Sequence, residues 1–493
     1  MKEREKFGSR IGFILVSAGC AIGLGNVWRF PFITGQYGGA AFIILYLIFL
    51  AILGIPVMVM EFSVGRGSQK SVASSFRELE PKGANYHLYG YIGMLGNYML
   101  MFFYTTICGW MFNYFFKMAS GKLSGLTPEE VGGVFGGMLG NPKELILWMV
   151  IAVVLAFFIC SLGLKNGVEK VTTVMMSLLF VLMIVMAIRA ITLPGASEGL
   201  KFYLVPDFGK MFENFGEVAF AALGQSFFTL SIGIGSMAIF GSYLSKERSL
   251  TGEAVSITAL DTFVAITAGL IIIPSCFAFG IDPGAGPGLI FVTLPNVFEQ
   301  MSGGQIWGTL FFLFMCFAAM STVVAVFENI LSFAMDLWNW SRQKAVLVNI
   351  VVVILGSIPC ILGFNLWSGF VPFGEGSGVL DLEDFIVSNN LLPLGSLIYL
   401  TFCVRRYGWG WDNFLAEADA GNGMKFPKVR FYVTYILPAI ILLVYLKGYW
   451  DFFGGQGLNQ WVGMTIAVCV LAVLGYIAFS RKKGTVPNGA PTL

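Results

Sequence analysis

Long apolar segments recur along the whole chain and are separated by short polar loops. About 20 consecutive apolar residues are enough to cross a lipid bilayer as a helix. The pattern therefore predicts an all-α polytopic membrane protein with about twelve transmembrane helices. We place these spans at residues 11–35, 39–64, 91–117, 145–163, 168–190, 214–243, 254–280, 305–337, 345–363, 385–404, 431–447 and 460–480.

Two of the spans, the first and the sixth, are interrupted near mid-membrane. Three glycines fall within residues 19–25, directly before Asn26, and residues 227–235 contain a second glycine-rich break. Glycine costs a helix interior about 1 kcal/mol relative to alanine. Non-helical backbone at membrane depth persists only where it is buried in protein or lines a wet cavity. Paired breaks of this kind indicate the binding site of a transporter.

The two breaks suggest an internal repeat. If they correspond, residues 11–192 (helices 1–5) and 214–407 (helices 6–10) follow one plan, and an odd number of helices inverts the second repeat relative to the first. Residues 1–10 then form an N-terminal gate segment, 430–481 hold helices 11 and 12, and 482–493 form a tail.

Composition and charge support a membrane location. The 493 residues are 57% hydrophobic and 12% charged, whereas soluble domains carry about 25% charged residues. Lys and Arg gather in alternate loops, and the stretches 281–304 and 364–384 contain none, which places both termini in the cytoplasm and the protein in the cell membrane. A net charge of +2 gives no indication of nucleic-acid binding.

The first break has the chemistry of an ion and carboxylate site. Unwinding frees the carbonyls of residues 19–22, which suit a hard cation, and leaves amides at residues 23–25, which favour a carboxylate. Glycines also form helix-packing faces. The nearby Asn26, Arg29 and Pro31 and the second break favour a binding site.

Residues 19–31, GCAIGLGNVWRFP, resemble the first-helix signature of the neurotransmitter:sodium symporter family. Residues 38–42, 224–231, 286–295 and 384–393 match further family patterns in the same order. The resemblance implies the LeuT fold, with a 5+5 inverted repeat in which helices 1 and 6 are unwound. It also implies sodium-coupled import by alternating access, and it is closest to bacterial transporters of hydrophobic amino acids.

The resemblance implies two bound sodium ions. The first is expected at the substrate carboxylate and at Ala21, Asn26, Thr229 and Asp261. The second is expected at Gly19, Ile22, Ala318, Ser321 and Thr322. Oxygen-only ligand sets suit such a hard cation. Hydroxyl groups inside a helix can instead bond back to their own backbone.

Asp261 is a carboxylate inside an apolar run, and an ionisable group within a span is a functional candidate by default. It could alternatively reach cytoplasmic water from a helix end. Chloride-dependent relatives have a neutral Asn here and a Ser one turn later, where this chain has Ala265. We therefore expect Asp261, beside Tyr46 and Gln225, to make transport independent of chloride.

Gly23 indicates the substrate class by resemblance, because amine-transporting relatives carry Asp there in place of a substrate carboxylate. The implied substrate pocket contains Ala21, Gly23, Gly25, Leu100, Tyr104, Phe228, Thr229, Ser231, Ile234, Thr322 and Val326. None of these side chains is charged, and Ile234 replaces an aromatic residue of a relative. Hydrophobic or aromatic L-amino acids, including bulky ones, are therefore expected.

The family resemblance also implies two pairs of gate residues. They are Arg29 with Asp384 on the outside, and Arg4 with Asp336 on the inside. Two further intramembrane carboxylates, Glu61 and Glu328, are expected to be structural partners. Helix 5 has Ser177 where the family often has Pro; without that Pro the helix should unwind less readily, which leaves the inner release route open.

Three other functions compete with sodium symport. A proton-coupled carrier of the same fold would titrate Asp261. A channel would need a continuous polar pore, whereas the polar positions here converge at one depth. A membrane enzyme is disfavoured, because the single histidine and the eight scattered cysteines form no evident catalytic or metal-binding motif. Beyond Na⁺, an amino acid and lipid, no partner is expected, and the protein should be a monomer or weak dimer.

Overall fold

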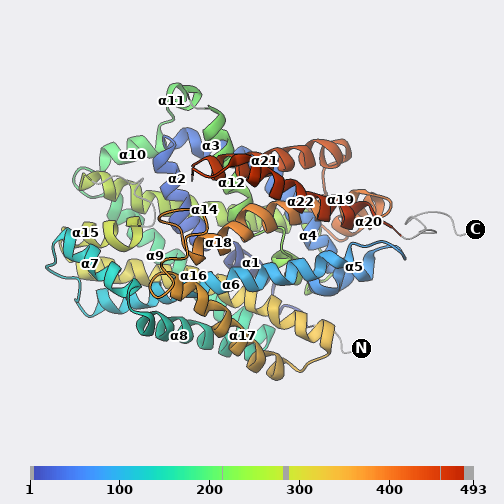
Figure 1. Ribbon diagram of the computed structural model, residues 1–493, viewed down its shortest axis with the longest axis horizontal. Helices are drawn as coiled ribbons and strands as arrows, with labels where there is room; N and C mark the ends of the chain where they lie inside the picture. Colours follow the sequence, from blue (N-terminus) through green and yellow to red (C-terminus); the bar gives the residue numbers. More distant parts are fainter. Residues whose placement is uncertain (1–4, 214, 281–287, 456, 482–493) are drawn as a thin grey trace, which may run out of the picture.

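The computed structural model describes residues 5–213, 215–280, 288–455 and 457–481. Arg4 and the predicted tail 482–493 therefore lie outside the described residues. Secondary structure in the described part is helical apart from two isolated β-bridges. Figure 1 shows long helices running side by side along one direction, as expected for a bundle that spans a bilayer.

Within the described residues, ten helices are long and apolar enough to cross a membrane. They are α3–η2–α4 (Ala40–Ser68), α6 (His87–Ala119), α8 (Pro142–Ser161), η3–α9 (Leu164–Ile191), α14 (Leu250–Ala278), α16 (Gly304–Trp338), α17 (Arg342–Gly363), α18–η5–α19 (Val379–Val404), η6–α21 (Tyr432–Gly455) and α22 (Gln460–Phe479), where η marks a π-helical turn.

The other two predicted spans are the interrupted ones. The first consists of α1 (Arg10–Ala21), then η1 (Gly25–Arg29) and α2 (Phe30–Gln36), with a bend of 58° between its halves. The sixth consists of α12 (Phe215–Thr229) and α13 (Ser236–Ser242), separated by residues 230–235. The expected polytopic all-α architecture with breaks in helices 1 and 6 is confirmed.

Several span boundaries differ from the hydropathy-based ones. The tenth span begins at Val379 instead of residue 385, and the eleventh ends at Gly455 instead of 447. The first turns of α18 (Val379–Ile386) contain Asp381, Glu383 and Asp384. These charges lower the local hydropathy although the backbone is already helical.

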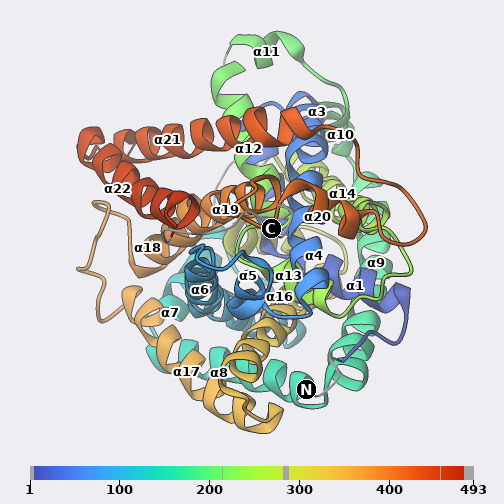
Figure 2. The ribbon, with the colours of Figure 1, turned by 90° about the vertical axis from the view of Figure 1, so that its right-hand side faces the viewer.

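The helices are arranged around α16, which packs against α6, α9 and α1. In the apolar stretch that would cross the membrane, 83% of the residues of α16 are buried, compared with only 28% of those of α22. Figure 2 shows α21 and α22 at the edge of the bundle, away from α1 and α16. The interrupted helices thus lie where three neighbouring spans, α4, α6 and α16, can supply side chains to their free backbone groups.

Short helices connect the spans. They are α5 (Val72–Leu79), α7 (Pro128–Leu139), α10 (Ala196–Leu204), α11 (Phe208–Glu213), η4–α15 (Leu289–Glu299) and α20 (Trp411–Ala418).

Candidate solute and sodium site

The first span leaves the helical conformation at Ile22, whose ψ of 100° is extended. The two amides that follow are bonded by side chains: Gly23 N donates to Asn26 Oδ1 (3.1 Å), and Leu24 N donates to the Tyr104 hydroxyl (3.2 Å). The break is therefore a defined structure whose polar groups point toward α6 and toward the sixth span.

The sixth span is unwound at residues 230–235, where every second residue from 231 has a left-handed backbone conformation. Ser231 (φ 49°), Gly233 (φ 107°) and Gly235 (φ 84°) occupy the region that favours glycine. Glu61 of α4 (Ile55–Ser68) accepts hydrogen bonds from Gly233 N (3.0 Å) and Met237 N (3.2 Å). This confirms a structural partner role for Glu61, because its carboxylate caps the start of α13.

The carbonyls of the same break are also bonded. Tyr89 donates to Gly233 O (2.7 Å), Asn97 to Ile234 O (2.8 Å) and Asn329 to Gly235 O (3.3 Å). These three donors were not predicted from the sequence. A polar residue on the buried face of α6 or α16 is a signal for them, but the partner depends on how the helices are rotated.

Three of the four residues predicted for the first sodium site, all except Ala21, come together between the two breaks. Asp261 of α14 accepts hydrogen bonds from Asn26 Nδ2 (2.8 Å) and from the Thr229 hydroxyl (2.9 Å). Asn26 Nδ2 also lies 3.0 Å from Thr229 Oγ1. All three side chains are at most 1% exposed, so they form a dry, oxygen-rich cluster at the unwound ends of both helices.

The predicted residues of the second sodium site meet between α1 and α16. The Thr322 hydroxyl contacts three carbonyl oxygens: Ile22 (3.1 Å), Gly19 (3.2 Å) and Ala318 (3.4 Å). The neighbouring Ser321 hydroxyl donates to Ala318 O (3.0 Å). Back-bonding of these hydroxyls to α16 is therefore present, but Thr322 also bridges to the broken first helix.

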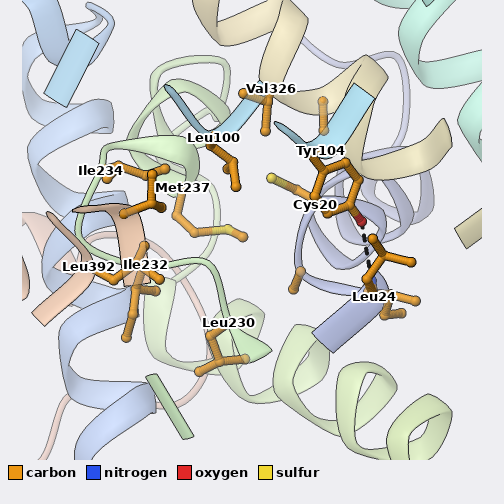
Figure 3. Close-up of a cluster of buried hydrophobic side chains, with 14 of the residues drawn as sticks. Cys20, Leu24, Leu100, Tyr104, Leu230, Ile232, Ile234, Met237, Val326 and Leu392 are labelled. Carbon is orange, nitrogen blue, oxygen red and sulfur yellow. Dashed lines mark hydrogen bonds between the residues drawn. The ribbon is translucent and has the colours of Figure 1, made fainter. Parts of the chain in front are cut away.

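A cavity of about 30 Å³ is lined by Thr322 of the second cluster and by Gly25 and Phe228, which precede Asn26 and Thr229 of the first. Eight of the predicted substrate residues line it: Ala21, Gly23, Gly25, Leu100, Tyr104, Phe228, Ser231 and Thr322. Leu24, Val387 and Leu392 line it as well and were not predicted, whereas Thr229, Ile234 and Val326 do not line it. Figure 3 shows Leu24 and Tyr104 on one side and Leu392 with Ile232 on the other.

Both glycines of the cavity are required sterically. A Cβ on Gly23 would lie 2.4 Å from the Tyr104 hydroxyl and 2.8 Å from Thr322 Oγ1. A Cβ on Gly25 would lie 2.8 Å from the Phe228 ring. The glycines thus let the first helix approach α6 and the sixth span closely.

The comparisons with known proteins agree with this architecture. The model of the "Sodium:neurotransmitter symporter family" matches residues 4–127 and 137–479. The chain belongs to this family. A sodium-dependent transporter of Bacillus subtilis, YhdH, is 36% identical to this symporter. The match covers 90% of this symporter and 97% of YhdH. A sodium-dependent transporter of Haemophilus influenzae is 34% identical over 90% and 98%, respectively.

A solved structure extends the likeness. The crystal structure of MhsT in complex with L-phenylalanine matches with a TM-score of 0.81 and 39% identity, covering 91% of this symporter and 100% of that chain. The protein is therefore a sodium-dependent transporter with the MhsT-like fold, a multi-pass membrane protein and not an enzyme. This confirms the expected family, transport class and sodium coupling.

The outer gate residues of this symporter are near the cavity but are not ion-paired. The Arg29 guanidinium lies 4.4 Å from the centre of the Phe228 ring, and Asp384 accepts a hydrogen bond from Ser388 (2.7 Å). Among the described residues, no ion pair joins Arg29 to Asp384 within 4.0 Å. Their pairing stays a prediction.

The predicted inner gate contains aromatic and charged groups. Phe7 contacts Phe13, Phe240 and Tyr243 at ring-centre distances of 5.5–6.4 Å. Asp336 accepts a hydrogen bond from Ser71 N (2.7 Å), and its predicted partner Arg4 lies outside the described residues. Nearby, Glu328 forms an ion pair with Arg342 (2.7 Å), which gives this carboxylate the expected structural partner.

The fifth span is helical from Leu164 to Ile191, beginning with the π turn η3 (Leu164–Glu169). Ser177, which stands where Pro is usual, donates back to Thr173 O (2.8 Å) and leaves the helix regular. Glu169 accepts bonds from Gly8 N (2.7 Å) and Ser9 N (3.0 Å) and so attaches the N-terminal segment to this span.

The region predicted to replace chloride is fully buried. Gln225 Nε2 donates to Gly25 O (3.0 Å), while Gln225 Oε1 and the Tyr46 hydroxyl have no hydrogen-bond partner. These two unbonded oxygens belong to residues in direct reach of the broken helices, so polar capacity remains there for a ligand.

Proposed function

We propose that this protein imports hydrophobic and aromatic L-amino acids together with two sodium ions, by alternating access and without a requirement for chloride. The observation that carries the proposal is a cavity between two unwound helices that is lined by Thr322 and by Gly25 and Phe228, the chain neighbours of the Asn26 and Thr229 side chains that bond Asp261. Oxygen ligands suit a hard cation, and half-helix amide ends suit a carboxylate.

Each cluster would accept one ion. At the first, Asn26 now directs its amide nitrogen at Asp261, so the amide must turn to present Oδ1 to a cation. At the second, the carbonyls of Gly19, Ile22 and Ala318 already surround the Thr322 hydroxyl. The substrate carboxylate would complete the first shell, so each ligand would strengthen the binding of the other.

The substrate class follows from what lines the cavity. Its side chains are uncharged, and Gly23 offers no carboxylate, so the solute has to supply one. The similar protein MhsT was crystallised with L-phenylalanine. Because the cavity measures about 30 Å³, roughly the space of one water molecule, an amino acid must displace part of the lining.

The proposed coupling is energetically sufficient for accumulation. A membrane potential supplies ~2.3 kcal/mol per charge per 100 mV. Two sodium ions would contribute roughly 4.6 kcal/mol, which corresponds to about 10³-fold accumulation of a neutral zwitterion. Cytoplasmic termini and a monomeric or weakly dimeric state complete the proposal.

Transport by the purified protein in liposomes tests it. Uptake of radiolabelled L-phenylalanine and L-leucine should require an inward Na⁺ gradient and should be unchanged when gluconate replaces chloride. Equal uptake in K⁺ would contradict sodium coupling. Uptake driven by an acid pulse in sodium-free vesicles would favour the proton-coupled alternative, and loss of uptake in gluconate would overturn chloride independence alone.

A further inference from the structure

The tenth span contributes two side chains to the cavity. Val387 and Leu392 both line it, and they are 0% and 4% exposed. Leu392 lies beside Ile232 of the unwound sixth span, opposite Leu24 and Tyr104 (Figure 3). One wall of the cavity therefore comes from a helix that carries no residue of either predicted sodium site.

These two residues reach the same cavity because of the π turn η5 (Val387–Leu391). Leu392 N donates to Val387 O, a bond between residues five apart. With 3.6 residues per turn, an unbroken α-helix would point residues five apart about 140° away from each other. The wider π turn brings them to nearly the same side.

The π turn is held in place by its neighbours. Pro393 cannot donate a backbone hydrogen bond, which weakens the regular helical pattern before it. Asn390 donates to Phe385 O (3.2 Å), and its Oδ1 accepts from Tyr449 (2.6 Å) and Tyr445 (3.2 Å) of α21. The direction of Val387 and Leu392 is therefore fixed by the eleventh span.

The same wall touches the broken sixth span through backbone. A Cβ on Gly233 would lie 2.2 Å from Leu392 O, and one on Gly395 would lie 2.1 Å from Gly233 O. No side chain separates the two helices at this point. The distance between the unwound segment and Leu392 is thus set by direct contact and cannot adapt readily to a larger solute.

Ile234, which the sequence favoured for specificity, is directed elsewhere. It does not line the cavity, and its Cγ2 would lie 3.0 Å from a Cβ on Gly96 of α6. Its side chain packs between the sixth and third spans, so it acts at most behind the wall of the cavity.

We infer that Val387 and Leu392 are specificity-determining residues, which form the wall that limits the length of the substrate side chain. The inference rests on the proposed function, because it assigns a wall of the proposed amino-acid pocket. Shortening either residue should admit longer side chains, and lengthening Val387 should exclude them. Neither change touches the residues assigned to sodium or to the substrate carboxylate.

Competition binding with the full-length purified protein tests the inference. In saturating Na⁺, unlabelled alanine, leucine, phenylalanine and tryptophan displace radiolabelled L-leucine, and the ratio of tryptophan to alanine affinity is measured. Val387→Ala and Leu392→Ala should each raise this ratio about tenfold, the discrimination typical of a methylene-sized change in an apolar pocket. Leu394→Ala is the matched control, since Leu394 is 2% exposed in the same helix but does not line the cavity.

Val387→Ile provides the reverse test and removes no packing volume. It should lower the same ratio while sodium dependence stays unchanged. An unchanged ratio in Val387→Ile and in whichever alanine variants retain binding overturns the inference and leaves the proposed function intact. A wild-type protein that binds no amino acid in Na⁺ overturns the proposed function, and the inference with it.

Discussion

Replacing Asp261 by asparagine removes one negative charge from the first polar cluster and preserves side-chain volume. Both carboxylate oxygens are bonded in the structure, one to Asn26 (2.8 Å) and the other to Thr229 (2.9 Å), and the residue is completely buried. An asparagine keeps one accepting oxygen, but its amide nitrogen cannot ligate a cation. The variant should therefore bind Na⁺ at this cluster much more weakly.

The magnitude follows from charge and distance. At a sodium–oxygen distance of about 2.4 Å and an effective dielectric constant of about 20, one charge contributes roughly 7 kcal/mol. The amide oxygen of the variant still acts as a neutral ligand and recovers part of this energy. A net loss of about 3 kcal/mol remains, so the half-saturating Na⁺ concentration should rise roughly 100-fold.

The assay is equilibrium binding of radiolabelled L-leucine across a Na⁺ titration, with choline holding the ionic strength constant. Asp381→Asn is the matched control, because this exposed carboxylate only caps its own helix by accepting from Gly378 N (2.7 Å). A midpoint for Asp261→Asn equal to that of the control would refute the assignment of Asp261 to sodium. Adding chloride to the variant tests whether an anion restores the missing charge.

Three further substitutions test other parts of the site. Gly23→Ala should abolish L-leucine binding, because its Cβ would lie 2.4 Å from the Tyr104 hydroxyl. Adding Tyr104→Phe should restore part of the binding. Gly133→Ala is the control and should leave binding unchanged, because a Cβ there meets nothing within 4 Å. Thr322→Val removes a hydroxyl that contacts the Gly19 and Ile22 carbonyls and should raise the half-saturating Na⁺ concentration about tenfold. Thr267→Val removes a hydroxyl that bonds only its own helix and should leave the Na⁺ titration at the wild-type midpoint. Glu61→Gln leaves the Gly233 or Met237 amide without an acceptor and should destabilise the protein by about 1.5–3 kcal/mol. Its melting temperature should be lower than that of the exposed control variant Glu198→Gln. Equal melting temperatures would mean that the Glu61 cap is not stabilising.

The number of spans and the positions of both breaks could be predicted from local pattern. Apolar length identifies a membrane helix, and glycine clusters such as residues 19–25 identify a weak one. The grouping of Asn26, Thr229 and Asp261 came from family resemblance, since these residues are far apart along the chain. No single-sequence pattern specifies that three distant side chains will meet.

The residues that were missed depend on helix rotation and on a change of helical pitch. Tyr89, Asn97 and Asn329 lie in helices whose buried faces show no apolar–polar contrast, so the sequence does not reveal which group each one faces. Val387 and Leu392 share a face only because η5 is π-helical, whereas the sequence reading assumed a regular helix. Asn390 and Pro393 are the nearest sequence signals for that turn.

The network around the unwound sixth span has a consequence for speed. Glu61, Tyr89, Asn97 and Asn329 hold residues 233–237 in the unwound conformation by hydrogen bonds that are made within the protein itself. The conformational entropy of this segment is therefore lost during folding and not upon each encounter with cargo. We therefore expect the rate of substrate binding to be limited by diffusion of the substrate into the site. The turnover rate should be limited by the closing and reopening of the helix bundle.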